Sequence, residues 1–182
     1  QIKRFLVELG NHKRWRFLRD LFRHHRGDKS NDADTRRWVM PIVYACMSMS
    51  KAKTGALIVI EQSIPLENYE KTGDMIDSAI NSRLIENIFF KNSPLHDGAM
   101  IIAHERIKAA GCILPVSHDT NIPRSMGLRH RSALGISQAT DAAAIVVSEE
   151  TGGISFAYRG SIVSRLSSTD LEHRLSQLVA NE

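Results

Sequence analysis

AAAIVVSEETGGISFAY, residues 142–158, is the stretch that decides the fold class. Its first part, Ala142–Val147, is a short continuous apolar run, which is typical of a strand buried on both faces of a sheet. Gly152-Gly153 is a strong hairpin signal, and Ile154–Tyr158 then returns as a second strand. An antiparallel hairpin that includes a fully buried strand favours a mixed sheet over an all-parallel one.

The same reading extends toward the N-terminus. The apolar runs Gly55–Glu61 and Ala99–Ala103 predict two more buried strands, and a turn at residues 104–106 leads into a strand over Ile107–Pro115. Helices are predicted between these strands, at Asp34 to about Lys53, Ser82–Phe90, Arg129 to about Ala139, and Thr169 to about Ala180. The predicted fold is therefore α/β (α+β), a mixed central sheet covered by helices.

Three helix details follow from residue preferences at helix ends. Asp32 or Asp34 would cap the first predicted helix, and Pro41 would be an awkward residue inside it unless it lay in the first turn. Thr169 and Glu172 have the spacing of a capping box for the last helix.

The N-terminal residues differ from the rest in charge. Residues 1–37 carry 11 Lys and Arg against 5 Asp and Glu, and the remaining residues carry a small negative balance. Residues 2–22 predict an amphipathic helix, and the polar residues 23–34 predict a linker. We therefore expect two parts, 1–33 and 34–182. The basic part would contact anionic lipid or nucleic acid, or simply be a solvated helix face.

The composition is that of one ordinary globular domain. Of the 182 residues, 42% are hydrophobic and 24% are charged. Cys46 and Cys112 lie far apart in apolar stretches, which predicts neither a disulfide framework nor a zinc site and fits a reducing compartment. No apolar run reaches the ~18 residues of a membrane span. Because the chain starts at Gln1, we expect a fragment of a longer protein, with membrane helices possible upstream.

The stretch PLHDGA, residues 94–99, is the first candidate site. Gly98 would let a ligand approach the backbone closely. The carboxylate of Asp97 suits a hard cation such as Mg²⁺, and the imidazole of His96 suits Mn²⁺ or Co²⁺ better. Taken alone, Asp-Gly is a common turn dipeptide, and a simple turn is the more frequent explanation.

Two further stretches favour the metal-site interpretation over the simple turn. GLRHRSA, residues 127–133, brings two arginines and a histidine to a helix start, where free N–H groups and arginine forks favour phosphate. SEETGG, residues 148–153, adds carboxylates after a buried strand, although each stretch alone is also consistent with a solvated helix start or a hairpin tip. Together they predict a metal–triphosphate site. The chain lacks the P-loop and GxGxxG patterns, so this site must use another framework.

DGA at 97–99 and RHR at 129–131 resemble the two signature motifs of the diadenylate cyclase (DAC) domain family. Five blocks resemble that family in the same order over roughly residues 34–165: KTGALIVIE (53–61), SPLHDGAMII (93–102), AAGCILPVS (109–117), GLRHRSALGIS (127–137) and AIVVSEETGGIS (144–155). The N-terminal helix and basic linker are similar to the CdaA type, whose members carry membrane helices upstream. The resemblance implies a mixed sheet of about seven strands wrapped by helices, and condensation of two ATP into cyclic di-AMP.

The resemblance also implies roles for individual residues. Asp97 would bind the metal (Mg²⁺, Mn²⁺ or Co²⁺) and help to activate the 3′-hydroxyl of ATP, while Gly98 and Ala99 would let the nucleotide lie against the backbone. The phosphates would be held by Arg129, His130 and Arg131. Further metal ligands would be His96 and Glu150, and Ser148 would contact the phosphates or the metal.

Two positions depart from the commonest family pattern. Leu128 stands where a threonine often precedes RHR, and Ile113 stands where an aromatic residue is frequent. Both positions would contact the nucleotide, so these departures would change affinity without changing the reaction. Base binding at Ile113 would then rest on apolar contact.

The resemblance implies ATP and a second copy of the chain as partners, because each 3′-hydroxyl attacks the α-phosphate of the other ATP. It further implies a membrane-associated regulator, phosphoglucosamine mutase, and a location at the cytoplasmic face of the bacterial membrane. The main alternative is a sensor that binds ATP or cyclic di-AMP without turnover, against which the intact Asp97 argues. No specific nucleic acid is expected, because the basic residues lie outside the domain and aromatic residues are only 6%.

Overall fold

The computed structural model describes residues 29–119, 122–123 and 126–180. The chain divides into two compact units, residues 1–35 and 36–182. The predicted helix over residues 2–22 lies outside the described residues. Helix α3 covers Lys29–Ala52, so the last six residues of the predicted linker are helical instead. Polar and charged residues are common in the first turns of a helix, so a linker assignment from composition overlooks such a start.

The early start of α3 makes the predicted cap wrong and places Pro41 at the awkward position inside the helix. Asp32 and Asp34 lie inside the helix and do not cap it, and Pro41 lies well beyond its first turn. A proline there has no N–H for the helical hydrogen bond and tends to bend the helix.

Seven strands form one mixed sheet in the order β2-β4-β3-β1-β5-β6-β7. Only β1 and β3 pair in parallel among these strands, and every other described pair is antiparallel. The sheet confirms the predicted fold class. The strands are β1 (Ala56–Ile60), β2 (Asp74–Ala79), β3 (Ala99–Ala103), β4 (Arg106–Cys112), β5 (Ala143–Val147), β6 (Ile154–Tyr158) and β7 (Ser161–Ser164).

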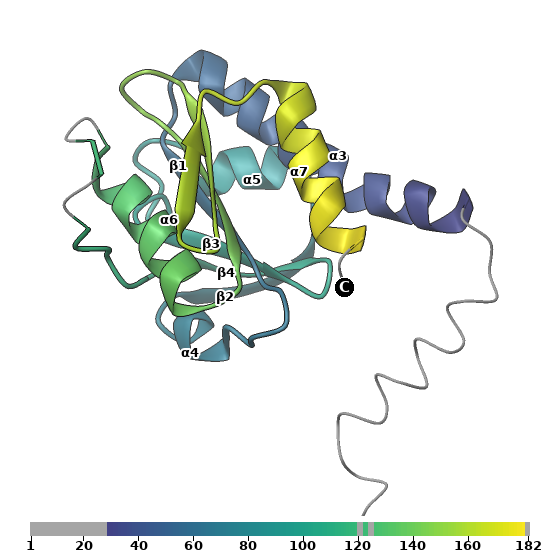
Figure 1. Ribbon diagram of the computed structural model, residues 1–182, viewed down its shortest axis with the longest axis horizontal. Coiled ribbons are helices and arrows are strands. Elements are labelled where there is room, and N and C mark those ends of the chain that lie inside the picture. The colour runs from purple at the N-terminus through teal and green to yellow at the C-terminus, as the bar shows by residue number, and fades with distance from the viewer. Residues whose placement is uncertain (1–28, 120–121, 124–125, 181–182) are drawn as a thin grey trace, which may run out of the picture. The chain divides into compact units, whose positions relative to one another are not determined.

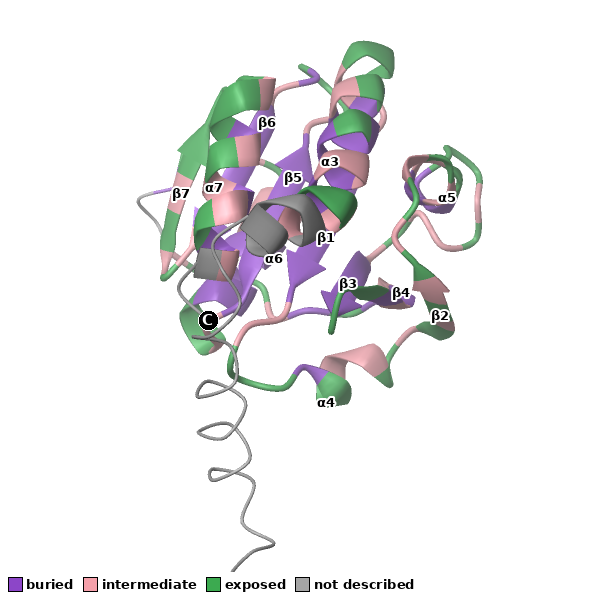
Figure 2. Cartoon of the chain, turned by 90° about the vertical axis from the view of Figure 1, so that its right-hand side faces the viewer, coloured by how far each residue is buried: buried purple, intermediate pink, exposed green. Residues whose placement is uncertain are grey.

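Helices cover both faces of the sheet (Figure 1). On one face α3 packs with α5 (Ser82–Ile88) and α7 (Ser168–Ala180) over a core that includes Ile58, Met100 and Ile145. On the other face lie the short α4 (Glu67–Glu70) and α6 (Leu128–Ala139), over the opposite side chains of the same strands. Figure 2 shows the central strands fully buried, as their continuous apolar runs predict.

Both predicted hairpins are present. His104 and Glu105 have φ of 52° and 58° at the tight turn between β3 and β4, and β5 pairs antiparallel with β6. β4 ends at Cys112, three residues before the predicted end at Pro115. The box at the start of α7 is formed by Ser167 and Asp170, each accepting from the other's backbone N–H, and not by the predicted pair Thr169 and Glu172.

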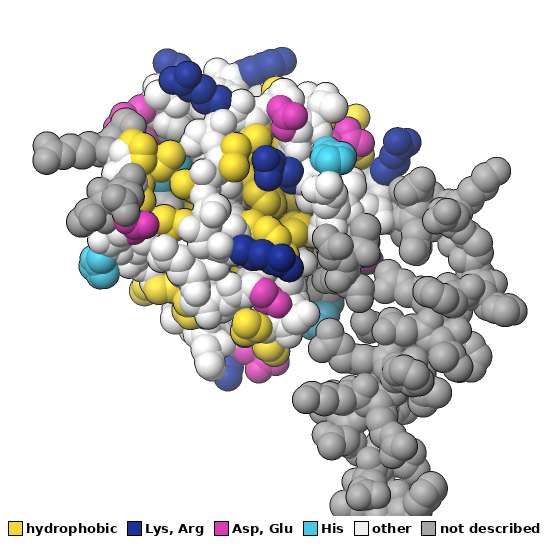
Figure 3. Space-filling view, in the orientation of Figure 1, with side chains coloured by type: hydrophobic (Ala, Val, Ile, Leu, Met, Phe, Trp, Pro, Cys, Tyr) yellow, Lys and Arg dark blue, Asp and Glu magenta, His cyan; other side chains and the backbone are white. Residues whose placement is uncertain are grey.

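Three elements had no local sequence signal. β2 and β7 are edge strands with mixed, mostly exposed residues, and α4 has only four residues. At β2, Asp77 adopts φ 47° in a bulge and binds Arg106 and Lys108 of β4, which blunts this exposed edge. The face drawn in Figure 3 carries basic and acidic side chains interspersed, with hydrophobic ones in its middle.

Candidate functional site

The predicted site stretches meet at one end of the sheet, because of how the strands pair. Ala56 at the start of β1 pairs with Val147 at the end of β5, and Ala99 at the start of β3 pairs with Cys112 at the end of β4. Since β1 and β3 are parallel, their starts lie at the same end. The loops before β3, after β4 and after β5 therefore come together there, with their predicted site residues.

The loop before β3 is held close to β4 by Gly98. This residue has φ +109°, and a Cβ on it would lie 2.7 Å from the carbonyl carbon of Gly111. Only glycine fits such a position without strain. The close packing leaves the side chain of Asp97 pointing outward, with 87% of it exposed, and buries Ala99 at the start of the strand.

His96 and Asp97 form a pair of potential metal ligands. His96 Nδ1 lies 2.6 Å from the backbone oxygen of Ser93, which can only accept, so Nδ1 carries the proton. Its Nε2 lies 3.5 Å from Asp97 Oδ1, where the neutral ring would present a lone pair to a cation. An imidazole nitrogen beside a carboxylate suits a divalent cation of the first transition row. Within the described residues, no group of three or more His, Cys, Asp and Glu gathers as a metal site, so Glu150 does not join this pair here.

Arg129 connects three loops at this end of the sheet. Its Nη1 lies 3.1 Å from Glu149 Oε2, and its Nη2 donates to the backbone oxygen of His96 over 3.5 Å. Its Nε is buried and has no hydrogen-bond partner within the described structure. A Cβ on Gly55 would lie 2.8 Å from the guanidinium carbon, so the absence of a side chain there makes room for Arg129. From the sequence, Glu149 is predicted only as one of the carboxylates of the SEETGG stretch, without a role of its own, and Gly55 has no predicted role.

The other two residues of RHR point elsewhere, as consecutive residues of a helical turn must. His130 Nε2 lies 3.3 Å from Ser155 Oγ on β6, and Ser155 Oγ donates to Ser164 Oγ on β7 over 3.1 Å. Burial lowers the pKa of His130 below its ordinary value. Arg131 Nη1 donates to the backbone oxygen of Asp119 over 3.5 Å. The structure thus brings only Arg129 into contact with the DGA loop.

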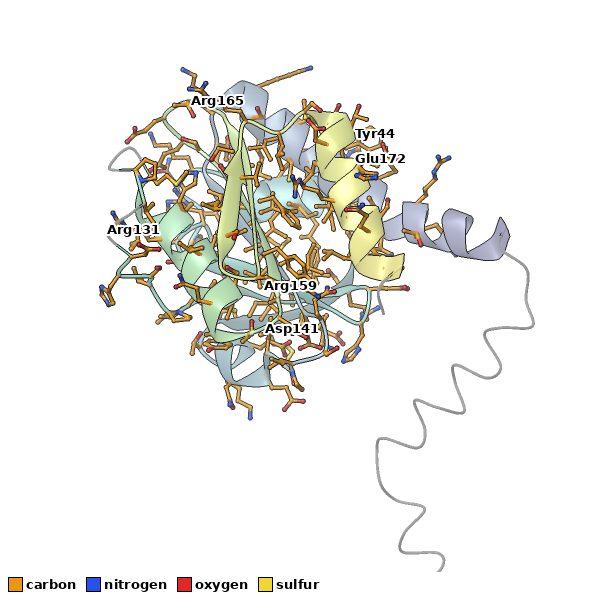
Figure 4. All side chains as sticks on the ribbon, viewed as in Figure 1. Tyr44, Arg131, Asp141, Arg159, Arg165 and Glu172 are labelled. Atoms are coloured by element: carbon orange, nitrogen blue, oxygen red, sulfur yellow. The ribbon has the colours of Figure 1, made fainter. Side chains whose placement is uncertain are left out.

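Helix α6 begins at this end with Gly127 as its N-cap, a residue that has no side chain to accept from the N–H groups of the first turn. Those donors and the helix dipole favour an anion. Leu128 and Ile113, the two predicted positions with apolar side chains, are 69% and 70% exposed. Figure 4 shows Arg131 beside the upper part of α6.

The loop after β5 is fixed by its own backbone. Ser148 N donates to Gly153 O, and the Ser148 side chain and backbone oxygens accept from Thr151 N and Gly152 N. Ser50 Oγ of α3 donates to Gly152 O over 2.6 Å, which ties the loop to the helix. The Ser148 hydroxyl therefore stabilises the loop itself. Glu149 and Glu150 are exposed on it, with Glu149 paired to Arg129.

A cavity of about 600 Å³ lies beside Ile113. Thr72 accepts from the backbone N–H of Ile113 over 2.8 Å at its wall. The cavity is shallow and open to solvent, and its lining is mostly apolar with a few polar groups. The lining consists of Ile64, Pro65, Asn68, Tyr69, Thr72, Ile113, Leu114, Pro115, Ala139 and Thr140.

A family model described as "DisA bacterial checkpoint controller nucleotide-binding" matches residues 43–162. Among curated relatives, the cyclic di-AMP synthase CdaA of Bacillus subtilis is 37% identical over 175 residues, covering 96% of this chain and 61% of the relative. A diadenylate cyclase of Listeria monocytogenes is 44% identical over 123 residues, covering 68% and 45%. The chain therefore spans less than two thirds of either relative.

Two solved structures are similar to this one. A double mutant of DacA from Staphylococcus aureus has a TM-score of 0.79 and 40% identity, covering 81% of this chain and 98% of that one. A hypothetical membrane spanning protein from Bacillus cereus has a TM-score of 0.67 and 40% identity, covering 69% and 62%. Among the helices described in the present chain, none combines the length and apolar character of a membrane span.

Proposed function

Because the chain belongs to the DisA bacterial checkpoint controller nucleotide-binding (DAC) family, we propose that it is the catalytic part of a diadenylate cyclase. It would condense two ATP into cyclic di-AMP and two pyrophosphates. The observation that carries this proposal is the contact between Arg129 and the backbone of His96, which joins the RHR motif to the DGA loop at one end of the sheet. On this proposal, the Asp97 carboxylate, the His96 imidazole and the Arg129 guanidinium would share one ligand site.

The residues present fit a divalent cation. His96 Nε2 and Asp97 Oδ1 are neighbouring donors of the types that bind Mn²⁺ and Co²⁺, and Asp97 alone suits Mg²⁺. Glu150 and Ser148 on the adjacent loop are proposed as further contacts. When bound, such a cation would offset the charge that develops on the phosphates and lower the pKa of the attacking hydroxyl.

The remaining chemistry falls to side chains of the chain itself. The carboxylate of Asp97 would take the proton as the 3′-oxygen forms its bond to the α-phosphorus and the bond to pyrophosphate breaks. Arg129, with His130, Arg131 and the start of α6, would hold phosphate oxygens and stabilise their charge in the transition state. Because Arg129 is fixed by Gly55 and His96, this donor needs little reorganisation during the reaction.

We propose that the base binds at Ile113. The backbone of Gly98 and Ala99, at the start of the neighbouring strand, would contact the nucleotide as well. The exposed Ile113 side chain borders the 600 Å³ cavity, and apolar contact there would replace aromatic stacking. Leu128 would contact the nucleotide without the hydroxyl that a threonine supplies.

Turnover requires a second copy of the chain. Each site would hold one ATP, and the product needs two ATP in antiparallel order, which a self-complementary two-fold interface provides. Specific activity should therefore rise with protein concentration across the range in which the dimer forms. A specific activity that stays constant while sedimentation shows a monomer would overturn this part of the proposal.

The cellular setting is proposed from the relatives. The B. subtilis relative is named a cyclic di-AMP synthase, and one similar structure belongs to a hypothetical membrane spanning protein. We place the domain of residues 34–182 at the cytoplasmic face of the bacterial membrane, with residues 1–33 as the segment next to the lipid. A membrane-associated regulator and phosphoglucosamine mutase are the proposed protein partners.

The test is direct. The protein is incubated with ATP and either Mg²⁺ or Mn²⁺, and cyclic di-AMP is measured by mass spectrometry beside Asp97→Asn. Product from the wild type and none from the variant would support the enzyme and its carboxylate together. If ATP binds but no product forms with any divalent metal at high protein concentration, the sensor alternative replaces the enzyme.

A further inference from the structure

The Arg129 guanidinium and its carboxylate partner differ in freedom to move. The Arg129 side chain is only 20% exposed and lies against the bare backbone of Gly55, between the Glu149 carboxylate and the His96 carbonyl. The Glu149 side chain is 64% exposed. The cation is therefore held in place by the fold, whereas the anion can turn into solvent at little cost.

The loop that carries Glu149 does not depend on its side chain. The turn is closed by backbone and hydroxyl groups of Ser148, Thr151 and Gly153, and Ser50 ties it to α3. Glu149 Oε2 contacts Arg129 Nη1, a guanidinium nitrogen that a phosphate oxygen would also approach, because Nε is buried. The carboxylate thus lies at an anion position on the proposed phosphate residue.

We propose that Glu149 is a built-in competitor of the triphosphate for Arg129, so that its charge sets the affinity of the site for polyphosphate. This inference rests on the proposed function only in taking Arg129 as a phosphate ligand. Two anions near one guanidinium repel each other, and each weakens the attraction of the other. Glu149 therefore lowers affinity for the phosphates and eases the release of pyrophosphate, and it is not required to shape the site.

The test uses inorganic tripolyphosphate as the probe, with binding measured by isothermal titration calorimetry. Glu149→Gln keeps the shape of the side chain and removes its charge. It should bind tripolyphosphate about fivefold more tightly, the upper end of the range for exposed ion pairs, because the arginine of this pair is mostly buried. The matched control is Glu105→Gln in the β3–β4 turn at the opposite end of the sheet, which makes the same change in net charge. It should bind like the wild type.

A second pair of variants tests whether Glu149 acts through Arg129. In Arg129→Ala, where no guanidinium remains to compete for, adding Glu149→Gln should change the dissociation constant by less than twofold. Equal or weaker binding by Glu149→Gln than by the wild type would overturn the inference, as would tripolyphosphate binding to neither protein. An equal gain in the Glu105→Gln control would also overturn it, because the effect would then be one of net charge.

The outcome is separate from that of the proposed function. If the wild type makes no cyclic di-AMP but Glu149→Gln binds tripolyphosphate more tightly, the enzyme proposal fails and this inference stands. If the wild type makes product and Glu149→Gln shows no gain in affinity, only this inference fails.

Discussion

The two ends of the sheet use their carboxylates in opposite ways. At the end where β1 finishes and β5 begins, Asp141 accepts from the backbone N–H groups of Ser63 and Ile64, each over 3.0 Å, and Glu61 accepts from Leu66 N over 2.7 Å. At the other end, Asp97 points outward beside His96, and its carboxylate accepts no backbone hydrogen bond among the described residues. Figure 4 shows Asp141 low in the domain, away from Arg131.

The difference indicates that carboxylates at one end of the sheet contribute to stability, whereas Asp97 at the other end contributes to function. A carboxylate that satisfies backbone donors stabilises the fold, because those donors would otherwise lose a partner. A carboxylate that accepts no hydrogen bond from the protein backbone is available to bind a ligand. We therefore expect substitutions at the Asp141 end to change the free energy of unfolding, and substitutions at the Asp97 end to change activity.

The largest expected effect is that of Asp97→Asn. Removing the charge should lower the rate of cyclic di-AMP formation by at least about 100-fold, as for other groups that move a proton in the transition state. The free energy of unfolding should change by less than about 0.5 kcal/mol, because the side chain is solvated. Rates by mass spectrometry and urea unfolding by circular dichroism check the two values. A large loss of stability would break the comparison.

The next largest effect is expected for Gly55→Ala, which tests whether activity depends on the fixed position of the Arg129 side chain. The new Cβ would clash with the guanidinium of Arg129. Moving that group should lower activity by about tenfold or more. The free energy of unfolding should change by less than about 1 kcal/mol, because the atoms in conflict are the end of a flexible side chain that can shift. In Gly127→Ala the added Cβ meets no atom within 4 Å, so this matched variant should lose much less activity. Equal losses in both variants would contradict the steric argument.

The same contrast explains what the sequence could predict of the fold. The buried strands β1, β3 and β5 are continuous apolar runs, so their positions follow from composition alone. Edge strand β2 reads DMIDSA and alternates irregularly between exposed and half-buried residues, so it is recognised only by its pairing with β4. The start of α3 was missed because polar residues at a helix N-terminus resemble a linker.

The site was predictable where residue type alone carries the chemistry. Asp97, His96 and Arg129 stand out by their motifs, and their proximity follows from strand directions that the sequence only suggests. Glu149 and Gly55 become visible only through their contacts with Arg129, since one is a loop glutamate and the other begins a strand 74 residues before its partner. A sequence without its tertiary contacts carries no signal for such pairs.

A smaller effect is expected at the opposite end of the sheet. Asp141→Ala would leave the N–H groups of Ser63 and Ile64 without their acceptor, at a cost of about 1–2 kcal/mol, similar to the loss of a helix cap. The rate of product formation per folded molecule should stay within about twofold of the wild type, because Asp141 contacts none of Asp97, His96 and Arg129. Of the residues that line the cavity beside Ile113, it reaches only the backbone of Ile64. Urea unfolding and mass spectrometry measure both. A loss of activity without a loss of stability would reverse the roles that we assign to the two ends.

The smallest expected effect concerns His130, the half-buried imidazole at the site end. Burial holds its pKa in the folded protein below the ordinary value of 6.5. Below pH 6.5 the unfolded chain therefore binds this proton more readily than the folded protein does. The stability contribution of neutral His130 is complete above pH 6.5 and is lost progressively as the pH falls below it.

His130→Asn should thus show a shallower fall in the free energy of unfolding between pH 7.5 and about 5.5 than the wild type, measured by urea unfolding at each pH. Parallel curves would show that the imidazole has the same pKa in the folded and unfolded protein. The ring that contacts Ser155 would then be exposed to solvent in the folded protein. A shallower curve would show that the site end, too, contains a group whose burial costs stability.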